Sequence, residues 1–205
     1  MERSLAFFGA FNPPTRAHID VAEIAMKTIG AEKVIFVPSK SDYILGDQKK
    51  GFAFPDSARI DMLAKIAGNR PWMEWTDIEM KQAVQPRTYD TLRKLRDLGE
   101  NPSLLLGADK LEELDHLWMN VREMADEFGI VCVDRSGMNC EDIIRESPFL
   151  MSLHMEIVHV PPVYMDISSS RVRKALTELY DLKGELQELL PPELDSLPVD
   201  LLLRG

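Results

Sequence analysis

Two short stretches of the sequence combine residue types that bind phosphate groups. The first, GAFNPPTRAH, places Thr15 and His18 three residues apart, after an apolar run, a glycine and two prolines. Across the start of a helix, that spacing lets a hydroxyl and an imidazole point towards one anion. Gly9 lacks the side chain that would block a close approach between backbone and ligand. A plain strand-to-helix connection, with Thr15 as a helix cap and His18 incidental, accounts for these residues equally well.

The second stretch, DISSSRVRKAL, places three serines directly before a helical pattern. The serines are Ser168, Ser169 and Ser170, and the basic residues that follow them are Arg171, Arg173 and Lys174. Hydroxyls and free N–H groups at a helix N-terminus, with guanidinium groups one turn further, form a phosphate site. A helix cap followed by solvated basic residues is the plainer alternative. Because two such helix starts occur in one acidic chain, we favour phosphate binding over the plain helix cap.

The composition limits the partners of the chain. Its 205 residues, 45% hydrophobic and 28% charged, predict one globular domain over 1–205. A formal net charge of -10 argues against nucleic acid or an anionic membrane as partner. Without a long apolar run or the features of a signal peptide, we expect a cytoplasmic protein. Cys132 and Cys140 lack metal-ligand spacing and are predicted to be reduced thiols.

The elements that must position these residues form a predicted parallel α/β sheet. Apolar runs predict strands at 4–8, 33–38, 103–107, 129–134 and 154–160, and helical periodicity covers 17–30, 56–68, 88–99 and 114–129. This alternation predicts a doubly wound sheet with right-handed crossovers, followed by a helical C-terminal part from about 166 to 205. The long segment 38–56 is predicted to be a lid or binding loop. GAFNPPT follows the first strand, where ligands bind in such sheets.

These stretches resemble the signatures of a known family. GAFNPPTRAH resembles G-[ST]-F-[DN]-P-x-[HT]-x-x-H of the nucleotidyltransferase superfamily, and ISSSRVR resembles its C-terminal I-S-S-[ST]-x-[IV]-R. LLLGADKLEELDHLW is similar to G-[AQ]-D-x-x-x-x-[FL]-x-x-W of the nicotinate/nicotinamide mononucleotide adenylyltransferases, and GIVCVDRSG and RTYDTL match further segments of that family. The resemblance extends from Leu5 to about Leu190.

The resemblance implies a Rossmann-like nucleotidyltransferase fold and adenylyl transfer. Nicotinate mononucleotide would attack the α-phosphate of ATP, with Mg²⁺ held by the ATP phosphates and not by protein ligands. Pyrophosphate would leave, and deamido-NAD would form for NAD biosynthesis. Nicotinamide mononucleotide, phosphopantetheine or another small phosphate ester remains open as acceptor, as does a catalytically weak nucleotide-binding protein. The implied partners are these small molecules, and a homo-oligomer is compatible with the sequence.

The same resemblance assigns the site residues. His18 would stabilise the transition state at the α-phosphate, assisted by Thr15 and Arg173. The implied ATP site comprises Gly9, Ala10, Phe11, His18, Lys49 or its neighbour Lys50, Ser168, Ser169, Ser170 and Arg173. The implied acceptor site comprises Thr88, Gly107, Asp109, Trp118 and Arg135. Three of these residues or pairs have a plainer interpretation: Asp109 as a helix cap, Trp118 as a core residue, and Lys49 with Lys50 as a solvated pair.

Several positions depart from the family pattern. Phe8, Ala10, Thr15 and Ala17 stand where the bacterial enzymes usually have glycine, threonine, histidine and glycine. In the lid, SDYILGDQKK replaces the usual Pro-Pro-His-Lys. The missing imidazole bears on how fast the reaction would run rather than on whether it occurs. The altered lid leaves open which pyridine the site accepts.

Overall fold

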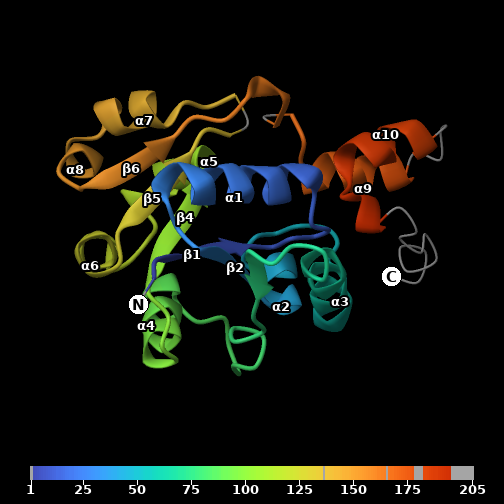
Figure 1. The fold of residues 1–205 in the computed structure, drawn as a ribbon, viewed down its shortest axis with the longest axis horizontal. Helices are drawn as coiled ribbons and strands as arrows, with labels where there is room; N and C mark the ends of the chain where they lie inside the picture. The colour runs from blue at the N-terminus through green and yellow to red at the C-terminus, as the bar shows by residue number, and fades with distance from the viewer. Residues whose placement is uncertain (1, 136, 165, 178–181, 195–205) are drawn as a thin grey trace.

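A parallel β-sheet forms the centre of the molecule in the computed structural model, which describes residues 2–135, 137–164, 166–177 and 182–194. Within these residues six strands pair in the order β3-β2-β1-β4-β5-β6 (Figure 1). The strands are β1 Ser4–Gly9, β2 Lys33–Pro38, β3 Met73–Trp75, β4 Pro102–Gly107, β5 Ile130–Val133 and β6 Met155–Val158. All five pairings are parallel, so the sheet is the doubly wound one that the sequence predicts.

Helices connect the strands and cover both faces of the sheet. They are α1 Arg16–Ile29, α2 Ser41–Leu45, α3 Asp56–Ala67, α4 Thr88–Asp97, α5 Ala108–Leu114, α6 Val121–Glu127, α7 Cys140–Glu146, α8 Pro148–Met151, α9 Ser169–Thr177 and α10 Leu182–Leu189. Short 3₁₀ turns occupy Pro162–Tyr164 and Pro192–Leu194. No helix among the described residues has the length and apolar character needed to cross a membrane.

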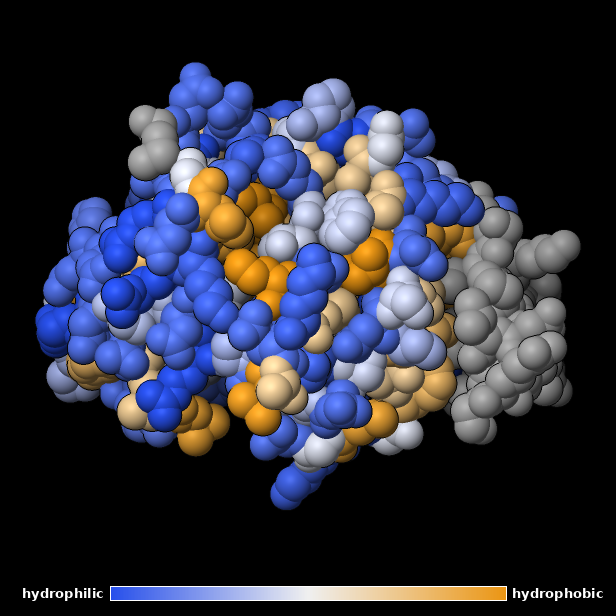
Figure 2. Space-filling model, turned by 90° about the horizontal axis from the view of Figure 1, so that it is seen from below, coloured by the Kyte–Doolittle hydropathy of each residue, from blue (hydrophilic) through white to orange (hydrophobic). Residues whose placement is uncertain are grey.

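Alternate residues of β1 belong to two different cores. Leu5 and Phe7 pack with side chains of α1, α3, α9 and the end of α10, whereas Ala6 packs with side chains of α4 to α8. Figure 1 accordingly shows α1 on one side of the sheet and α4 on the other. Because both faces are covered, the strands read as continuous apolar runs. Seen from the α4 side, the surface is largely hydrophilic, with small apolar clusters between charged side chains (Figure 2).

The predicted elements are largely confirmed. All five predicted strands are present, and Cys132 and Cys140 are free and buried. The single helix predicted over 114–129 is wrong, because α5 ends at Leu114 and α6 starts only at Val121, after Asn120 in the left-handed conformation with φ 61°. β3, α2, α7 and α8 were not predicted from the sequence patterns. The predicted helical C-terminal part contains α9 and α10, and its residues 178–181 and 195–205 lie outside the described residues.

Candidate active site

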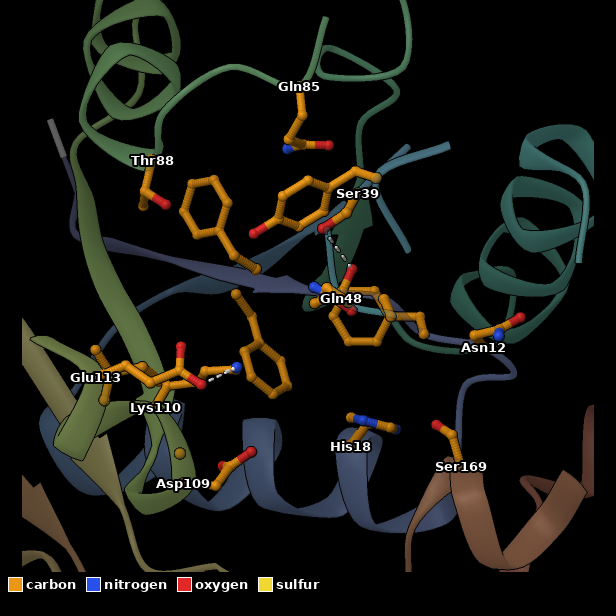
Figure 3. Close-up of a pocket in the computed structure, with 18 of the residues that line it drawn as sticks. Asn12, His18, Ser39, Gln48, Gln85, Thr88, Asp109, Lys110, Glu113 and Ser169 are labelled. Atoms are coloured by element: carbon orange, nitrogen blue, oxygen red, sulfur yellow. Dashed lines mark hydrogen bonds and ion pairs between the residues drawn. The ribbon is translucent and has the colours of Figure 1, made fainter. Parts of the chain in front are cut away.

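A cavity of about 550 Å³ lies where the sheet switches direction. Its lining includes residues from the carboxyl ends of β1 and β4 and from the segments that follow β2, β5 and β6. β1 and β4 are neighbours in the sheet, and the chain runs from β1 to β2 towards one edge but from β4 to β5 towards the other, which opens a crevice between the carboxyl ends of β1 and β4. Gln85 and Thr88 lie at one end of the cavity, and His18 and Ser169 lie at the opposite end (Figure 3).

The start of α1 holds His18 in a fixed orientation. Thr15 is the N-cap of α1, and its side chain accepts the His18 backbone N–H at 3.4 Å. In return, the Thr15 backbone N–H donates to His18 Nδ1 at 3.0 Å, and Thr15 Oγ1 lies 2.7 Å from the same nitrogen. A backbone N–H can only donate, so Nδ1 is an acceptor and the neutral ring carries its proton on Nε2.

The proton on His18 Nε2 faces a second donor. Arg135 Nη2 lies 3.3 Å from Nε2, and both residues line the cavity. Burial, followed by the positive charges of Arg135 and Lys50, holds the His18 pKa well below its ordinary value. The imidazole is therefore neutral at pH 7, and two hydrogen-bond donors converge where an anionic oxygen could accept from both.

Phe11 supports the imidazole from the other side. Its ring is 1% exposed and contacts the His18 ring edge-on, with centroids 5.2 Å apart. A Cβ atom at Gly9 would lie 3.1 Å from the Phe11 ring. The glycine at position 9 thus lets the Phe11 ring pack closely against the backbone, a role that the motif did not predict. Gly9, Ala10 and Phe11 all line the cavity.

The serine-rich stretch at the start of α9 is hydrogen-bonded to the loop that follows β1. Ser169 Oγ donates to Pro13 O at 2.8 Å, and Arg173 Nη1 donates to Asn12 O at 2.7 Å. Arg173 Nη2 also donates to Ser170 Oγ at 3.0 Å. These bonds bring the N-terminus of α9 beside that of α1, although about 150 residues separate the two stretches. Ser168, Ser169, Ser170 and Arg173 all line the cavity.

The lid, residues 38–56, is anchored by two buried side chains that the sequence analysis missed. Asn12 is fully buried and bonds to the backbone of Phe52 and Phe54, each at 2.8 Å. Arg59 is also fully buried; it donates to Ala10 O at 2.8 Å and to Asp56 Oδ1 at 2.6 Å. Both side chains tie the end of the lid to the loop after β1. An arginine inside an amphipathic helical pattern gives no sequence signal of such a role.

The lid contributes Lys50 to the cavity. Lys50 lines the cavity and is half-buried, whereas Lys49 is exposed and lies outside the lining. Burial, reinforced by the charges of Arg173, Lys110 and Arg135, lowers the Lys50 pKa, which indicates that these cations surround one space. Lys110, a further lining residue that the sequence analysis missed, pairs with Glu113 at 2.6 Å. The cations thus gather locally in a chain of net charge -10.

The end of β4 brings Asp109 and Arg135 together. A Cβ atom at Gly107 would lie 2.5 Å from Asp109 Oδ1 and 2.9 Å from Arg135 Cδ, so a side chain at this position would force Asp109 and Arg135 to shift. Asp109 Oδ1 is buried and has no hydrogen-bond partner among the described residues, and Arg135 Nε lies 3.9 Å from it. The helix-cap alternative for Asp109 is wrong, because Gly107 holds the N-cap position of α5 and Asp109 lies inside that helix. Oδ1 is a free acceptor for a ligand hydroxyl.

Trp118 and Thr88 line the cavity as well. Trp118 lies between α5 and α6, where it is partly buried against the core on the α4 side of the sheet, so the core alternative holds in part. Its Nε1 donates to Glu113 at 3.4 Å. Thr88 is the first residue of α4. Thr15, by contrast, is fully buried and does not line the cavity, so it can act only through His18. Further polar lining residues are Ser39, Tyr43, Gln48, Glu79 and Gln85.

Comparisons with known proteins give a consistent picture. The sequence model of the cytidylyltransferase-like family matches residues 6–175. A probable nicotinate-nucleotide adenylyltransferase of Dehalococcoides mccartyi is 30% identical over 188 residues, covering 90% of this chain and 88% of the relative. One of Clostridium tetani is 24% identical, covering 92% and 94%. The solved nicotinic acid mononucleotide adenylyltransferase of Plasmodium falciparum, complexed with NaAD, matches with a TM-score of 0.74 at 20% identity, covering 100% of this chain and 96% of that one.

Proposed function

The chain belongs to the cytidylyltransferase-like family and, within it, to the nicotinate-nucleotide adenylyltransferases, and from that premise we propose the reaction of its cavity. An oxygen of the 5'-phosphate of nicotinate mononucleotide bonds to the α-phosphorus of ATP. The bond from the α-phosphorus to the oxygen bridging the β-phosphate breaks, and pyrophosphate leaves with that oxygen. The product is deamido-NAD, a dinucleotide of NAD biosynthesis.

The observation that carries this proposal is the pair of converging donors at His18 Nε2 and Arg135 Nη2, 3.3 Å apart. Negative charge grows on the α-phosphate oxygens during the transfer, and donors already aimed at those oxygens stabilise the transition state without reorganising. A neutral imidazole is sufficient for this task, because it donates a hydrogen bond and exchanges no proton. His18 is accordingly a catalytic residue in this proposal, and Thr15 is a positioning residue.

The remaining lining residues divide between the two substrates. The triphosphate of ATP lies against Ser169, Ser170 and Arg173 at the N-terminus of α9, where free N–H groups and the helix dipole favour anions. Lys50 approaches the phosphates from the lid. The acceptor ribose donates to the orphaned Asp109 Oδ1.

At the far end of the cavity, the pyridine ring of the acceptor stacks on Trp118. Its ring substituent lies at the N-terminus of α4, beside Thr88. The two substrates thereby extend in opposite directions from the His18–Arg135 pair.

The described lining suits a divalent cation that arrives with ATP. Around the proposed phosphate positions it offers hydroxyls, N–H groups and cations, and the described residues include no group of three or more histidine, cysteine, aspartate or glutamate side chains able to hold a metal ion. We therefore propose that Mg²⁺ binds through the ATP phosphate oxygens. When bound, the ion neutralises phosphate charge and stabilises the leaving pyrophosphate.

A pyrophosphate-release panel tests the reaction. ATP is offered with nicotinate mononucleotide, nicotinamide mononucleotide or phosphopantetheine, and release with nicotinate mononucleotide is the expected result. Loss of one oxyanion donor costs about 10²–10³ in kcat, so His18→Ala should fall by that factor with its fold intact. His154→Ala is the control, since this histidine is exposed and outside the cavity. Release only with another acceptor, or none at all, would overturn the proposal.

A further inference from the structure

Glu79 is a buried carboxylate in the cavity wall for which the reaction described above has no role. It lies in the segment between β3 and α4, is 2% exposed, and lines the cavity together with Gln85 and Thr88. Burying a charge costs free energy unless partners compensate for it, so a carboxylate in this position requires an explanation.

Two hydrogen bonds fix the Glu79 carboxylate under the start of α4. Thr91 Oγ1 donates to Oε1 at 2.9 Å, and Gln85 Nε2 donates to Oε2. Thr91 lies in the first turn of α4 and Gln85 lies three residues before Thr88, so the two bonds hold the chain on either side of Thr88. A shift of Glu79 would therefore move the backbone that is proposed to meet the acceptor ring.

The same network reaches the lid. Gln85 Oε1 accepts the Lys40 backbone N–H at 2.9 Å, and Lys40 Nζ donates to Met80 O at 3.0 Å and to Gln82 O at 2.8 Å. Lys40 immediately precedes α2, and its ammonium binds the segment that carries Glu79. The charge on Glu79 thus lies between the acceptor end of the cavity and the root of the lid.

The charged groups around Glu79 offset its burial only in part. The hydrogen bonds from Gln85 and Thr91 lower the pKa of Glu79, followed by the charge of Lys94 of α4. Two further cations are near: Lys40 donates to the backbone of Met80, next to Glu79, and Arg87 lines the cavity beside Thr88. Burial outweighs these effects and raises the Glu79 pKa to about 7. Both protonation states are therefore populated near neutral pH.

We propose that Glu79 determines which charge the ring substituent of the acceptor can carry, because its carboxylate lines the cavity and is held by Gln85 and Thr91, on either side of Thr88, at the end where that substituent lies. This inference rests on the proposed function. Ionised Glu79 repels the carboxylate of a nicotinate ring and tolerates the neutral amide of nicotinamide. Protonated Glu79 removes the repulsion. The site therefore prefers the carboxylate acceptor most strongly below the pKa of Glu79 and loses part of that preference above it.

The proposal can be tested in the unmodified enzyme, because acceptor binding and protonation of Glu79 are thermodynamically coupled. If ionised Glu79 opposes a bound carboxylate, then the bound carboxylate must raise the pKa of Glu79 by the same coupling. At pH 8, binding of nicotinate mononucleotide should take up a fraction of a proton more than binding of nicotinamide mononucleotide. Calorimetric titrations in buffers of different ionisation enthalpy measure this difference. The two ligands share the ribose and the 5'-phosphate, so protons taken up at His18 or at the phosphate cancel.

Kinetics provide the second readout. Between pH 6 and 8.5 the wild-type KM for nicotinate mononucleotide should rise about fivefold to tenfold more than the KM for nicotinamide mononucleotide, a coupling of ordinary size. Glu79→Gln keeps the shape and an acceptor oxygen but cannot ionise. Its KM for the carboxylate acceptor should stay at the low-pH wild-type level, and its difference in proton uptake should vanish.

Glu127→Gln is the matched control. Glu127 is exposed on α6 and likewise accepts two bonds from α4, from Tyr89 Oη at 2.6 Å and from Arg96 Nη1 at 3.0 Å, but it lies outside the cavity. This variant should retain the wild-type pH dependence. Two results would overturn the inference while leaving the proposed function intact. One is equal proton uptake with both acceptors in the wild-type enzyme, and the other is a Glu79→Gln variant with the wild-type pH dependence of KM. If the wild-type enzyme turns over neither mononucleotide, the proposed function fails as well.

Discussion

Replacing Thr15 by valine tests whether this residue acts through His18 or on the phosphate itself. Valine keeps the shape and the backbone N–H but removes Oγ1, which caps α1 at 3.4 Å and lies 2.7 Å from His18 Nδ1. The backbone N–H still donates to Nδ1 at 3.0 Å, so the proton on Nε2 stays in place. We therefore expect kcat for pyrophosphate release to fall less than tenfold, far less than the 10²–10³ expected for loss of a transition-state donor.

The cost of Thr15→Val should appear in stability instead. Loss of the helix cap costs about 1 kcal/mol, and loss of a buried neutral hydrogen bond costs about another 1 kcal/mol. In a chain of this length each kcal/mol lowers Tm by about 2–4 °C, so thermal unfolding should shift by roughly 4–8 °C. A variant that loses turnover as severely as His18→Ala while keeping the wild-type Tm would refute the reasoning, since Thr15 would then contact the phosphate directly.

Three further predictions concern the lining of the cavity. Gly107→Ala should raise the acceptor KM between about tenfold and a hundredfold, because the new Cβ would press on Asp109 at 2.5 Å; an unchanged KM would contradict the ribose role. Lys50→Ala should lower kcat/KM for ATP by about tenfold or more, whereas Lys49→Ala should leave it within about twofold of wild type, as measured by steady-state kinetics. A larger loss in Lys49→Ala than in Lys50→Ala would exclude Lys50 as the phosphate-binding lysine. The lowered pKa of His18 means that the unfolded chain binds its proton first, so the free energy of unfolding should decrease as pH falls below 6.5. Denaturant titrations of wild type and His18→Gln should show that the variant loses part of this slope; equal slopes would contradict the buried neutral imidazole.

The sequence predicted those parts of the fold that local patterns determine. Mostly continuous apolar runs identified the first four of the five longer strands, because burial on both faces leaves little alternation, whereas three of the four residues of β6 are only partly buried. The edge strand β3 has only three residues, Met73–Trp75, and no pattern is long enough to reveal it. The break between α5 and α6 spans residues 115–120 and ends at Asn120 in a left-handed conformation, and the surrounding apolar spacing conceals it.

The motifs predicted residues that line the cavity where those residues belong to the motif itself. His18, Asp109 and the serines of α9 line the cavity as the motifs indicate. Asn12, Arg59 and Glu79 could not be found in this way, since their burial and partners are set by the lid and by the segment before α4. Polar residues of this kind follow no periodic pattern and become interpretable only when distant segments are in contact.

The departures from the family signature leave the proposed catalytic geometry intact. Ala10 contributes its carbonyl oxygen to Arg59 at 2.8 Å, a contact that does not depend on the side chain. Ala17 is 6% exposed within α1, where a small apolar residue packs readily. Thr15 supplies a backbone donor and a hydroxyl that hold the imidazole of His18, while Arg135 brings a guanidinium to within 3.3 Å of it. A second imidazole would add a cation beside the α-phosphate, and the guanidinium already provides one that stays charged at every physiological pH. The structure therefore favours an active enzyme over a weak nucleotide-binding protein.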